Sequence, residues 1–210
     1  MSPDLSCYLV LDAAVCGARM VEVGRAAAAG GAGVVQLRMK DATTAERIAT
    51  GRAVQAALAG RSAFVVNDDV EAAIALGADG VHVGQGDMPA EAVRRAIGAG
   101  RLLGLSVETE AQARAVPDSV DYIGAGPVRA TATKPGHAAP TGWDGFARIA
   151  AAAAPVPAVA IGGVAADDAE RAVRAGAVGL AVVSAICGQA DPRRAAAAIA
   201  GAMTRAREAA

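Results

Sequence analysis

One stretch of the sequence places an amide, a guanidinium and an ammonium at alternate positions, in Gln36, Arg38 and Lys40. Side chains of a strand alternate between its two faces, so we expect these three on one face and Leu37 and Met39 on the other. Buried cations are costly unless anions meet them, and the polar face therefore predicts a site for an anionic ligand. Taken alone, the stretch is better explained as an edge strand with one solvated face, so the choice depends on the rest of the sequence.

Further polar residues follow other apolar runs. Asn67 and Asp68 end one run, Asp87 follows the next, and Ser106 lies near the end of a third. Two acids at the ends of adjacent strands, opposite a cationic face, suit a Mg²⁺ ion held by carboxylates and ligand phosphates. Each acid taken singly is better explained as a helix cap, a role open to Asp68 or Asp69 and to Asp87.

A second group of residues predicts a site for a single phosphate. The Gly162-Gly163 pair lets backbone N–H groups approach a phosphate, and Val183 and Ser184 follow in the next apolar run. The long segment 127–142 carries hydroxyls and an ammonium that we expect near the same ligands. The hydroxyls belong to Thr131 and Thr133 and the ammonium to Lys134, with Ala132 between the threonines.

Short apolar runs must position these residues. Most are continuous in Val, Ile and Leu, as in parallel strands that are buried on both faces. The runs that we interpret as strands are Tyr8–Asp12, Val34–Met39, Ala63–Asn67, Gly80–Gly84, Leu102–Val107, Tyr122–Gly126, Pro157–Gly162 and Leu180–Ile186.

Helical segments separate these runs, and similar glycine-containing joins lead into three of them. The joins 30–34, 77–81 and 176–180 each fit a helix C-cap followed by a tight turn. Eight strands alternating with helices predict one (β/α)8 TIM barrel, with residues 1–210 as a single catalytic domain. A doubly wound open sheet is the alternative, but no Gly-rich dinucleotide fingerprint follows the first run.

Composition narrows the class of protein. The 210 residues are 54% hydrophobic with a net charge of -1 and only 2% aromatic residues, which argues against a nucleic-acid surface. The longest apolar stretch, 149–161, is too short to span a membrane. Three cysteines without metal-like or redox spacing, and no apparent secretory signal, predict a cytoplasmic protein with reduced thiols.

The motifs as a set resemble the thiamine-phosphate synthase family. They occur in the family's order and cover almost the whole predicted barrel. They are Gln-Leu-Arg-Met-Lys (36–40), Asn-Asp-Asp (67–69), Gly-Val-His-Val-Gly-Gln-Gly-Asp (80–87), Leu-Ser-Val (105–107), Gly-Ala-Gly-Pro-Val (124–128), Thr-Ala-Thr-Lys (131–134), Ala-Ile-Gly-Gly-Val (160–164) and Val-Val-Ser-Ala-Ile (182–186).

The resemblance implies a dissociative substitution between two small molecules, with pyrophosphate leaving. The substrates would be 4-amino-2-methyl-5-(diphosphooxymethyl)pyrimidine and 4-methyl-5-(2-phosphooxyethyl)thiazole, here called the pyrimidine diphosphate and the thiazole phosphate. The implied pyrimidine diphosphate ligands are Gln36, Arg38, Lys40, Asn67, Ser106 and Lys134, with Leu37 and Met39 in the same segment. The implied Mg²⁺ ligands are Asp68 and Asp87, and the implied thiazole phosphate ligands are Thr131, Thr133, Gly163, Val183 and Ser184, with Ala132 in the same substrate-binding segment.

The implied catalytic residues are Arg38, Lys40, Ser106 and Lys134. The chain also departs from the family's pattern. Met39 replaces an acid, Arg129-Ala130 replaces an aromatic-Pro pair, and Glu108 stands where many relatives have a histidine or another polar residue. The alternatives are a thiazole tautomerase, expected to carry a histidine near the end of the fifth strand, and a non-catalytic phosphate-binding barrel. Assembly with further copies of the chain is left open.

Overall fold

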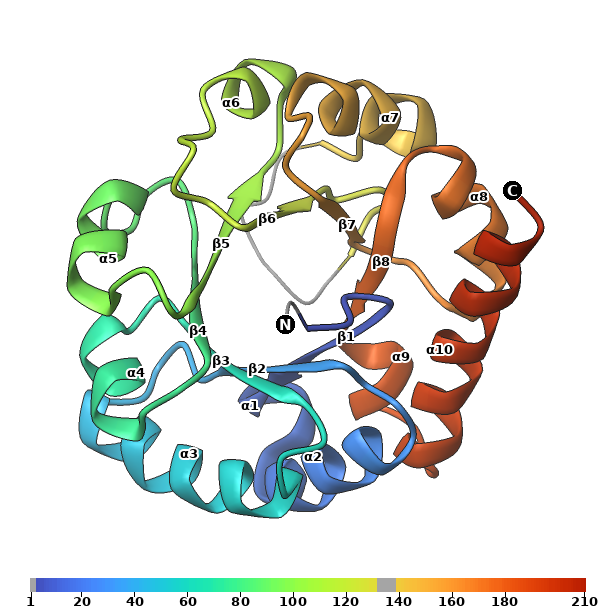
Figure 1. The fold of residues 1–210 in the computed structure, drawn as a ribbon. Helices are drawn as coiled ribbons and strands as arrows, with labels where there is room; N and C mark the ends of the chain where they lie inside the picture. The colour runs from blue at the N-terminus through green and yellow to red at the C-terminus, as the bar shows by residue number, and fades with distance from the viewer. Residues whose placement is uncertain (1–2, 132–138) are drawn as a thin grey trace.

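The computed structural model describes residues 3–131 and 139–210, and parallel strands in this part of the chain close into a barrel. Each strand pairs with its neighbours in sequence, and β8 pairs with β1. Figure 1 looks along the barrel, with the helices forming an outer ring. The strands are β1 Cys7–Asp12, β2 Val34–Arg38, β3 Ala63–Asn67, β4 Gly80–Val83, β5 Leu102–Val107, β6 Tyr122–Ala125, β7 Ala158–Ile161 and β8 Ala177–Val182. The predicted TIM barrel is confirmed.

The predicted bounds of the last strand are wrong. We expected a strand over Leu180–Ile186, whereas β8 ends at Val182 and residues Ser184–Cys187 form a helical turn, α9. A continuous apolar run has no periodicity that separates a strand from a buried helix. Pairing sets the observed bounds, because Ala177 already lies beside β7 and Val182 is the last residue of β8 beside β1.

The remaining helical elements follow the strands along the chain. They are α1 Ala13–Cys16, η1 Gly17–Arg19, α2 Met20–Ala29, α3 Thr44–Leu58, α4 Val70–Leu76, α5 Ala90–Ile97, α6 Glu110–Arg114, α7 Gly142–Ala152, η2 Ala166–Asp168, α8 Ala169–Arg174 and α10 Pro192–Glu208. The start of α10 has a side-chain cap, since Asp191 accepts a hydrogen bond from the backbone N–H of Arg194 and proline occupies the first turn.

Two apolar clusters stabilise the barrel from its two sides. The larger one lies between the strands and the surrounding helices and includes Leu37, Phe64 and Phe146. The smaller one is made by side chains of the inner face of the barrel. Its buried members are Tyr8, Val10, Val34, Val65, Tyr122, Val159 and Ala181.

The segment before β1 closes the N-terminal end of the barrel, and it lies within the ring of strands in Figure 1. The backbone carbonyls of Asp4 and Leu5 lie directly against Gly33 and Gly179, where a Cβ atom would collide with them. Ser6 Oγ donates to Asp4 Oδ1 at 2.6 Å and holds the turn. Glycine at the two contact positions is therefore required by the close approach of the backbones.

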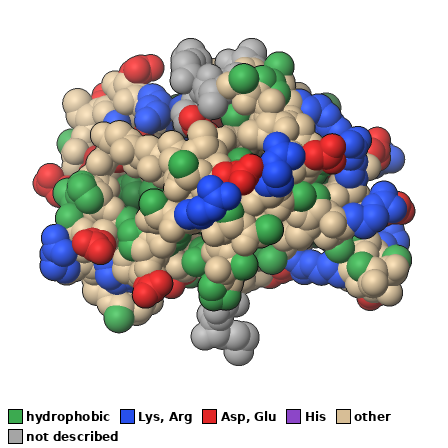
Figure 2. All heavy atoms as spheres, turned by 90° about the horizontal axis from the view of Figure 1, so that it is seen from above, with side chains coloured by type: hydrophobic (Ala, Val, Ile, Leu, Met, Phe, Trp, Pro, Cys, Tyr) green, Lys and Arg blue, Asp and Glu red, His purple; other side chains and the backbone are tan. Residues whose placement is uncertain are grey.

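The outer surface carries charges of both signs. Figure 2 shows basic and acidic side chains interspersed on the face in view, in keeping with the net charge of -1. Among the helices of residues 3–131 and 139–210, none combines the length and the apolar character needed to cross a bilayer.

Candidate functional site

A cavity of about 670 Å³ opens at the C-terminal ends of the strands. The structure brings most of the predicted ligands to this one cavity. Those lining it are Gln36, Arg38, Lys40, Asn67, Asp68, Asp87, Ser106, Thr131, Gly163, Val183 and Ser184. The end of the barrel is the one at which TIM barrels hold their ligands.

Some predicted residues do not reach the cavity or cannot be placed. The side chain of Leu37 is 1% exposed in the cluster between strands and helices, and Met39 packs against the same cluster. The alternation predicted for this stretch therefore holds, although β2 itself ends at Arg38. Residues Ala132, Thr133 and Lys134 lie outside the described residues, as does His137.

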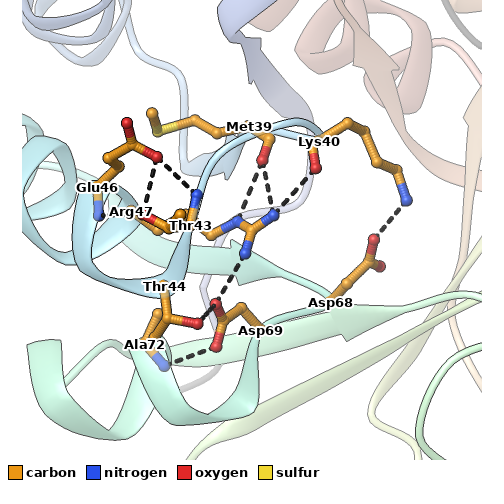
Figure 3. Close-up of polar contacts among 9 residues, drawn as sticks. All are labelled: Met39, Lys40, Thr43, Thr44, Glu46, Arg47, Asp68, Asp69 and Ala72. Carbon is orange, nitrogen blue, oxygen red and sulfur yellow. Dashed lines mark hydrogen bonds and ion pairs between the residues drawn. The ribbon is translucent and has the colours of Figure 1, made fainter.

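Two cations lie on one wall of the cavity, each beside an acid. Lys40 Nζ is 2.5 Å from Asp68 Oδ2. Figure 3 shows the two side chains pointing toward each other. Arg38 Nη1 forms an ion pair with Asp12 Oδ2, and the Asp12 side chain is only 3% exposed. Asp12 lies at the end of β1 and also caps α1, so it fixes the guanidinium from the neighbouring strand. The sequence analysis did not identify this partner.

Asp68 and Asp87 come together from the ends of β3 and β4. Burial raises the pKa of Asp68, and the contact with Asp87 raises it further against the lowering effect of Lys40. Asp87 Oδ2 accepts the N–H of Gly84 at 2.7 Å. The helix-cap alternative is confirmed for Asp69, which caps α4, so this role does not fall to Asp68. It is wrong for Asp87, because Pro89 stands at the N-cap of α5.

This pair of carboxylates fits the donor chemistry of Mg²⁺. Two crowded carboxylates are stabilised by a hard divalent cation, which takes oxygen ligands and completes its shell with water and ligand phosphates. Within the described residues, no three His, Cys, Asp or Glu side chains form a cluster able to hold a metal ion. The predicted site therefore offers two protein ligands, and water and an anionic ligand would complete the shell of the ion.

The opposite wall contains the predicted phosphate site. Gly162 and Gly163 both have a positive φ, of 94° and 65°, in the turn after β7. Val183 and Ser184 follow β8, with Ser184 as the first residue of α9. In a ring of eight strands β3 and β7 lie on opposite sides, so the acids and the glycine turn face each other across the cavity.

A chain of hydrogen bonds crosses the inner end of the cavity. Gln36 Nε2 donates to Tyr8 Oη at 2.8 Å, and the two tyrosine hydroxyls are 2.7 Å apart. His82 then connects Tyr122 Oη, 3.2 Å from Nδ1, to Ser106 Oγ, 3.0 Å from Nε2. Burial raises the pKa of both tyrosines, so both remain neutral phenols. These hydrogen bonds orient two of the predicted ligands, Gln36 and Ser106.

The sequence did not indicate a role in the site for the middle residues of this series of hydrogen bonds. The protein has two tyrosines, and both point into the barrel. Their signal was the two-residue period, since Tyr8 shares a face with Val10 and Asp12. His82 is buried and hydrogen-bonded, and it also lines the cavity.

Arg129, a departure from the family's pattern, joins the turns after β6 and β7. Its guanidinium forms a two-bond contact with Asp168, at 2.8 and 2.5 Å, and donates to the carbonyl of Gly163 at 2.9 Å. It also lies over the ring of Trp143, 6.0 Å from the centroid. The hydrogen bonds from Arg129 lower the pKa of Asp168.

We expect Asp168→Asn to remove an acid-sensitive contribution to stability. A carboxylate whose pKa is lowered on folding stabilises the fold above its unfolded pKa, near 4, and this stabilisation is lost as the pH falls through the folded pKa. Because Arg129 is half exposed, we expect about 1 kcal/mol, or a thermal midpoint ~2–4 °C lower at pH 7. Thermal unfolding between pH 7 and 3 measures it, and the difference from the unmodified protein should shrink below about pH 4. A constant difference across that range contradicts the assignment.

The family model described as "Thiamine monophosphate synthase" matches residues 7–186 of the chain. The chain belongs to this family. A curated thiamine-phosphate synthase from Laribacter hongkongensis is 49% identical over 192 residues, 90% of each chain. Another, from Moorella thermoacetica, is 39% identical over 98% of this chain and 99% of its own.

Solved structures agree with the family assignment. A thiamine phosphate pyrophosphorylase from Pyrococcus furiosus superposes with a TM-score of 0.86 and 32% identity over 97% of both chains. A 3-hexulose-6-phosphate synthase superposes with a TM-score of 0.68 but only 20% identity, covering 94% of this chain and 99% of its own. The second comparison supports the barrel fold alone.

Proposed function

We propose that the chain is a thiamine-phosphate synthase, a transferase that joins the pyrimidine diphosphate to the thiazole phosphate. The products are thiamine phosphate and pyrophosphate, residues 1–210 act as one catalytic domain, and the reaction takes place in the cytoplasm. The proposal is supported by one cavity with two walls that suit anionic ligands. One wall has cations and paired acids at and after the ends of β2, β3 and β4, and the other has a glycine turn and a hydroxyl after β7 and β8.

The pyrimidine diphosphate is assigned to the first wall. Lys40 and Arg38 offset the charge of the diphosphate, and this matters most as the leaving group separates and its negative charge grows. Gln36 and Ser106 orient the pyrimidine ring at the inner end of the cavity. Both are held by the series of hydrogen bonds through Tyr8, Tyr122 and His82. Asn67 adds an amide beside the acids.

Mg²⁺ is assigned to Asp68 and Asp87. When bound, it neutralises charge on the diphosphate and so makes pyrophosphate a better leaving group. The protein contributes two oxygen ligands and the ammonium of Lys40 beside them, 2.5 Å from Asp68. A substitution in which the pyrimidine stabilises its own carbocation needs no closely paired general acid and base, and electrostatics and orientation then supply the catalysis.

The thiazole phosphate is assigned to the second wall. Backbone N–H groups of the Gly162-Gly163 turn and of Val183-Ser184 suit a phosphate, and Thr131 reaches the same cavity. This placement directs the thiazole ring toward the pyrimidine, because the two walls face each other across the barrel. Holding two reactants in line contributes several kcal/mol to such a step, on the order of 7 or more.

The proposal is tested by incubating the protein with both substrates and Mg²⁺. Thiamine phosphate and pyrophosphate should appear in equal amounts and with the same time course. Binding of both substrates without any product would instead indicate a phosphate-binding barrel. Isomerisation of the thiazole phosphate alone would indicate a tautomerase, although Ser106-Val107-Glu108 provides no histidine at the end of β5.

A further inference from the structure

Arg47 lies behind the wall of the cavity and joins the segments that carry Lys40 and Asp68. Its Nε and Nη2 donate to the carbonyl of Met39 at 3.1 and 2.9 Å, and Nη2 also donates to the carbonyl of Lys40 at 3.1 Å. Its Nη1 donates to Asp69 Oδ2 at 3.0 Å. Figure 3 shows these contacts on one side and the Lys40–Asp68 ion pair on the other.

Arg47 and Asp69 both lie at the starts of helices that fix their positions. Arg47 follows a capping box at the start of α3, in which Thr43 and Glu46 exchange hydrogen bonds. Asp69 is the N-cap of α4, where Oδ1 accepts the N–H of Ala72 at 2.8 Å while Oδ2 accepts from Thr44 at 2.9 Å. The two side chains are 19% and 10% exposed, so the ion pair is largely shielded from water.

The segments on the cavity side need such support. β2 ends at Arg38, so the carbonyls of residues 39 and 40 lie beyond the last residue of the strand, and Arg47 donates to both. Asp68 has a φ of 63°, a left-handed conformation that is unfavourable for a residue with a side chain. Such a conformation persists only where its surroundings hold it, and Asp69 is the next residue in the chain.

We propose that Arg47 is a positioning residue, which acts through Asp69 to hold Lys40 and Asp68 at the spacing that a diphosphate requires. The inference rests on the proposed function for the identity of the ligand. Neither Arg47 nor Asp69 lines the cavity, so neither touches the ligand. The planar guanidinium is needed because it donates in three directions at once, which an ammonium on a flexible stem cannot reproduce.

The test compares Arg47→Gln with Arg52→Gln, a control at an exposed arginine of the same helix. Calorimetry measures binding of pyrophosphate with Mg²⁺ and, separately, of the thiazole phosphate. We expect Arg47→Gln to weaken pyrophosphate binding about tenfold, to leave thiazole phosphate binding within about twofold, and Arg47→Lys to rescue only part of the loss. The control should leave both affinities unchanged.

The proposal would be overturned if Arg47→Gln weakened the binding of both ligands equally. It would also be overturned if the variant lost thermal stability while its affinity for pyrophosphate stayed unchanged. If Arg47→Gln fails to fold, Asp69→Asn replaces it, since asparagine still caps α4 while the ion pair is lost. In the double variant, the second substitution should add little to the first. These binding measurements need no turnover. An unmodified protein that binds pyrophosphate but forms no product would refute the proposed function, and the role of Arg47 would still be decided by the binding measurements.

Discussion

Replacing Lys40 by alanine should lower kcat/KM for the pyrimidine diphosphate by about 100-fold or more, the loss typical of removing one preorganised group that stabilises developing charge. The ammonium lines the cavity and lies 2.5 Å from Asp68. The substitution removes the cation that we assign to the leaving group. It also removes the group that lowers the pKa of Asp68. Steady-state kinetics with the thiazole phosphate held at saturation measure the effect.

The matched control is Met39→Glu, one residue away. The side chain of Met39 packs against the cluster between strands and helices, outside the main cavity. Its contact with Arg47 is made by the backbone carbonyl. A glutamate there should therefore change kcat/KM by less than about fivefold. Comparable losses in the two variants would contradict the assignment of Gln36, Arg38 and Lys40 to the ligand side.

Asp87→Asn should lower kcat by roughly 100-fold at a fixed Mg²⁺ concentration, because metal assistance is worth several kcal/mol and a neutral amide is a poor ligand for this ion. Asparagine keeps an oxygen that can accept the N–H of Gly84, so the turn after β4 should survive. Activity measured over a Mg²⁺ titration should show half-activation shifted to higher concentration. Removal of the metal with a chelator should abolish activity of the unmodified protein.

Asp118→Asn is the control for general charge effects, since Asp118 is exposed in the segment before β6, at the other end of the barrel. It should leave the Mg²⁺ dependence unchanged. A response of Asp87→Asn to Mg²⁺ that matches the unmodified protein would refute its assignment as a metal ligand. Both variants should be compared by thermal unfolding, so that a loss of fold is recognised as such.

The barrel could be predicted from local patterns alone. Continuous apolar runs such as 63–67 and 102–107 match β3 and β5, and the glycine joins before β2, β4 and β8 carry the turns between helix and strand. The polar face of the stretch 34–40 follows from the two-residue period of a strand. These features depend on neighbours in sequence, which is why the sequence was sufficient for them.

The support around the site depends on partners that are distant in sequence. Asp12 meets Arg38 across two strands, and Tyr8 meets Tyr122 across the barrel, 114 positions away. No local pattern distinguishes such residues from ordinary core or surface positions. The end of β8 was mispredicted for a related reason, since only pairing with β1 and β7 separates the strand from the turn that begins at Ser184.

The segment before β1 affects the route by which molecules can come and go. The backbone of Asp4 and Leu5 packs against Gly33 and Gly179, and the inner apolar cluster lies below the cavity that opens at the C-terminal ends of the strands. Under the proposed function, pyrophosphate would leave through the opening by which both substrates arrive, and it would occupy the wall assigned to the pyrimidine diphosphate. A slowly released pyrophosphate would then keep the next pyrimidine diphosphate out, so we expect inhibition by this product to compete with that substrate.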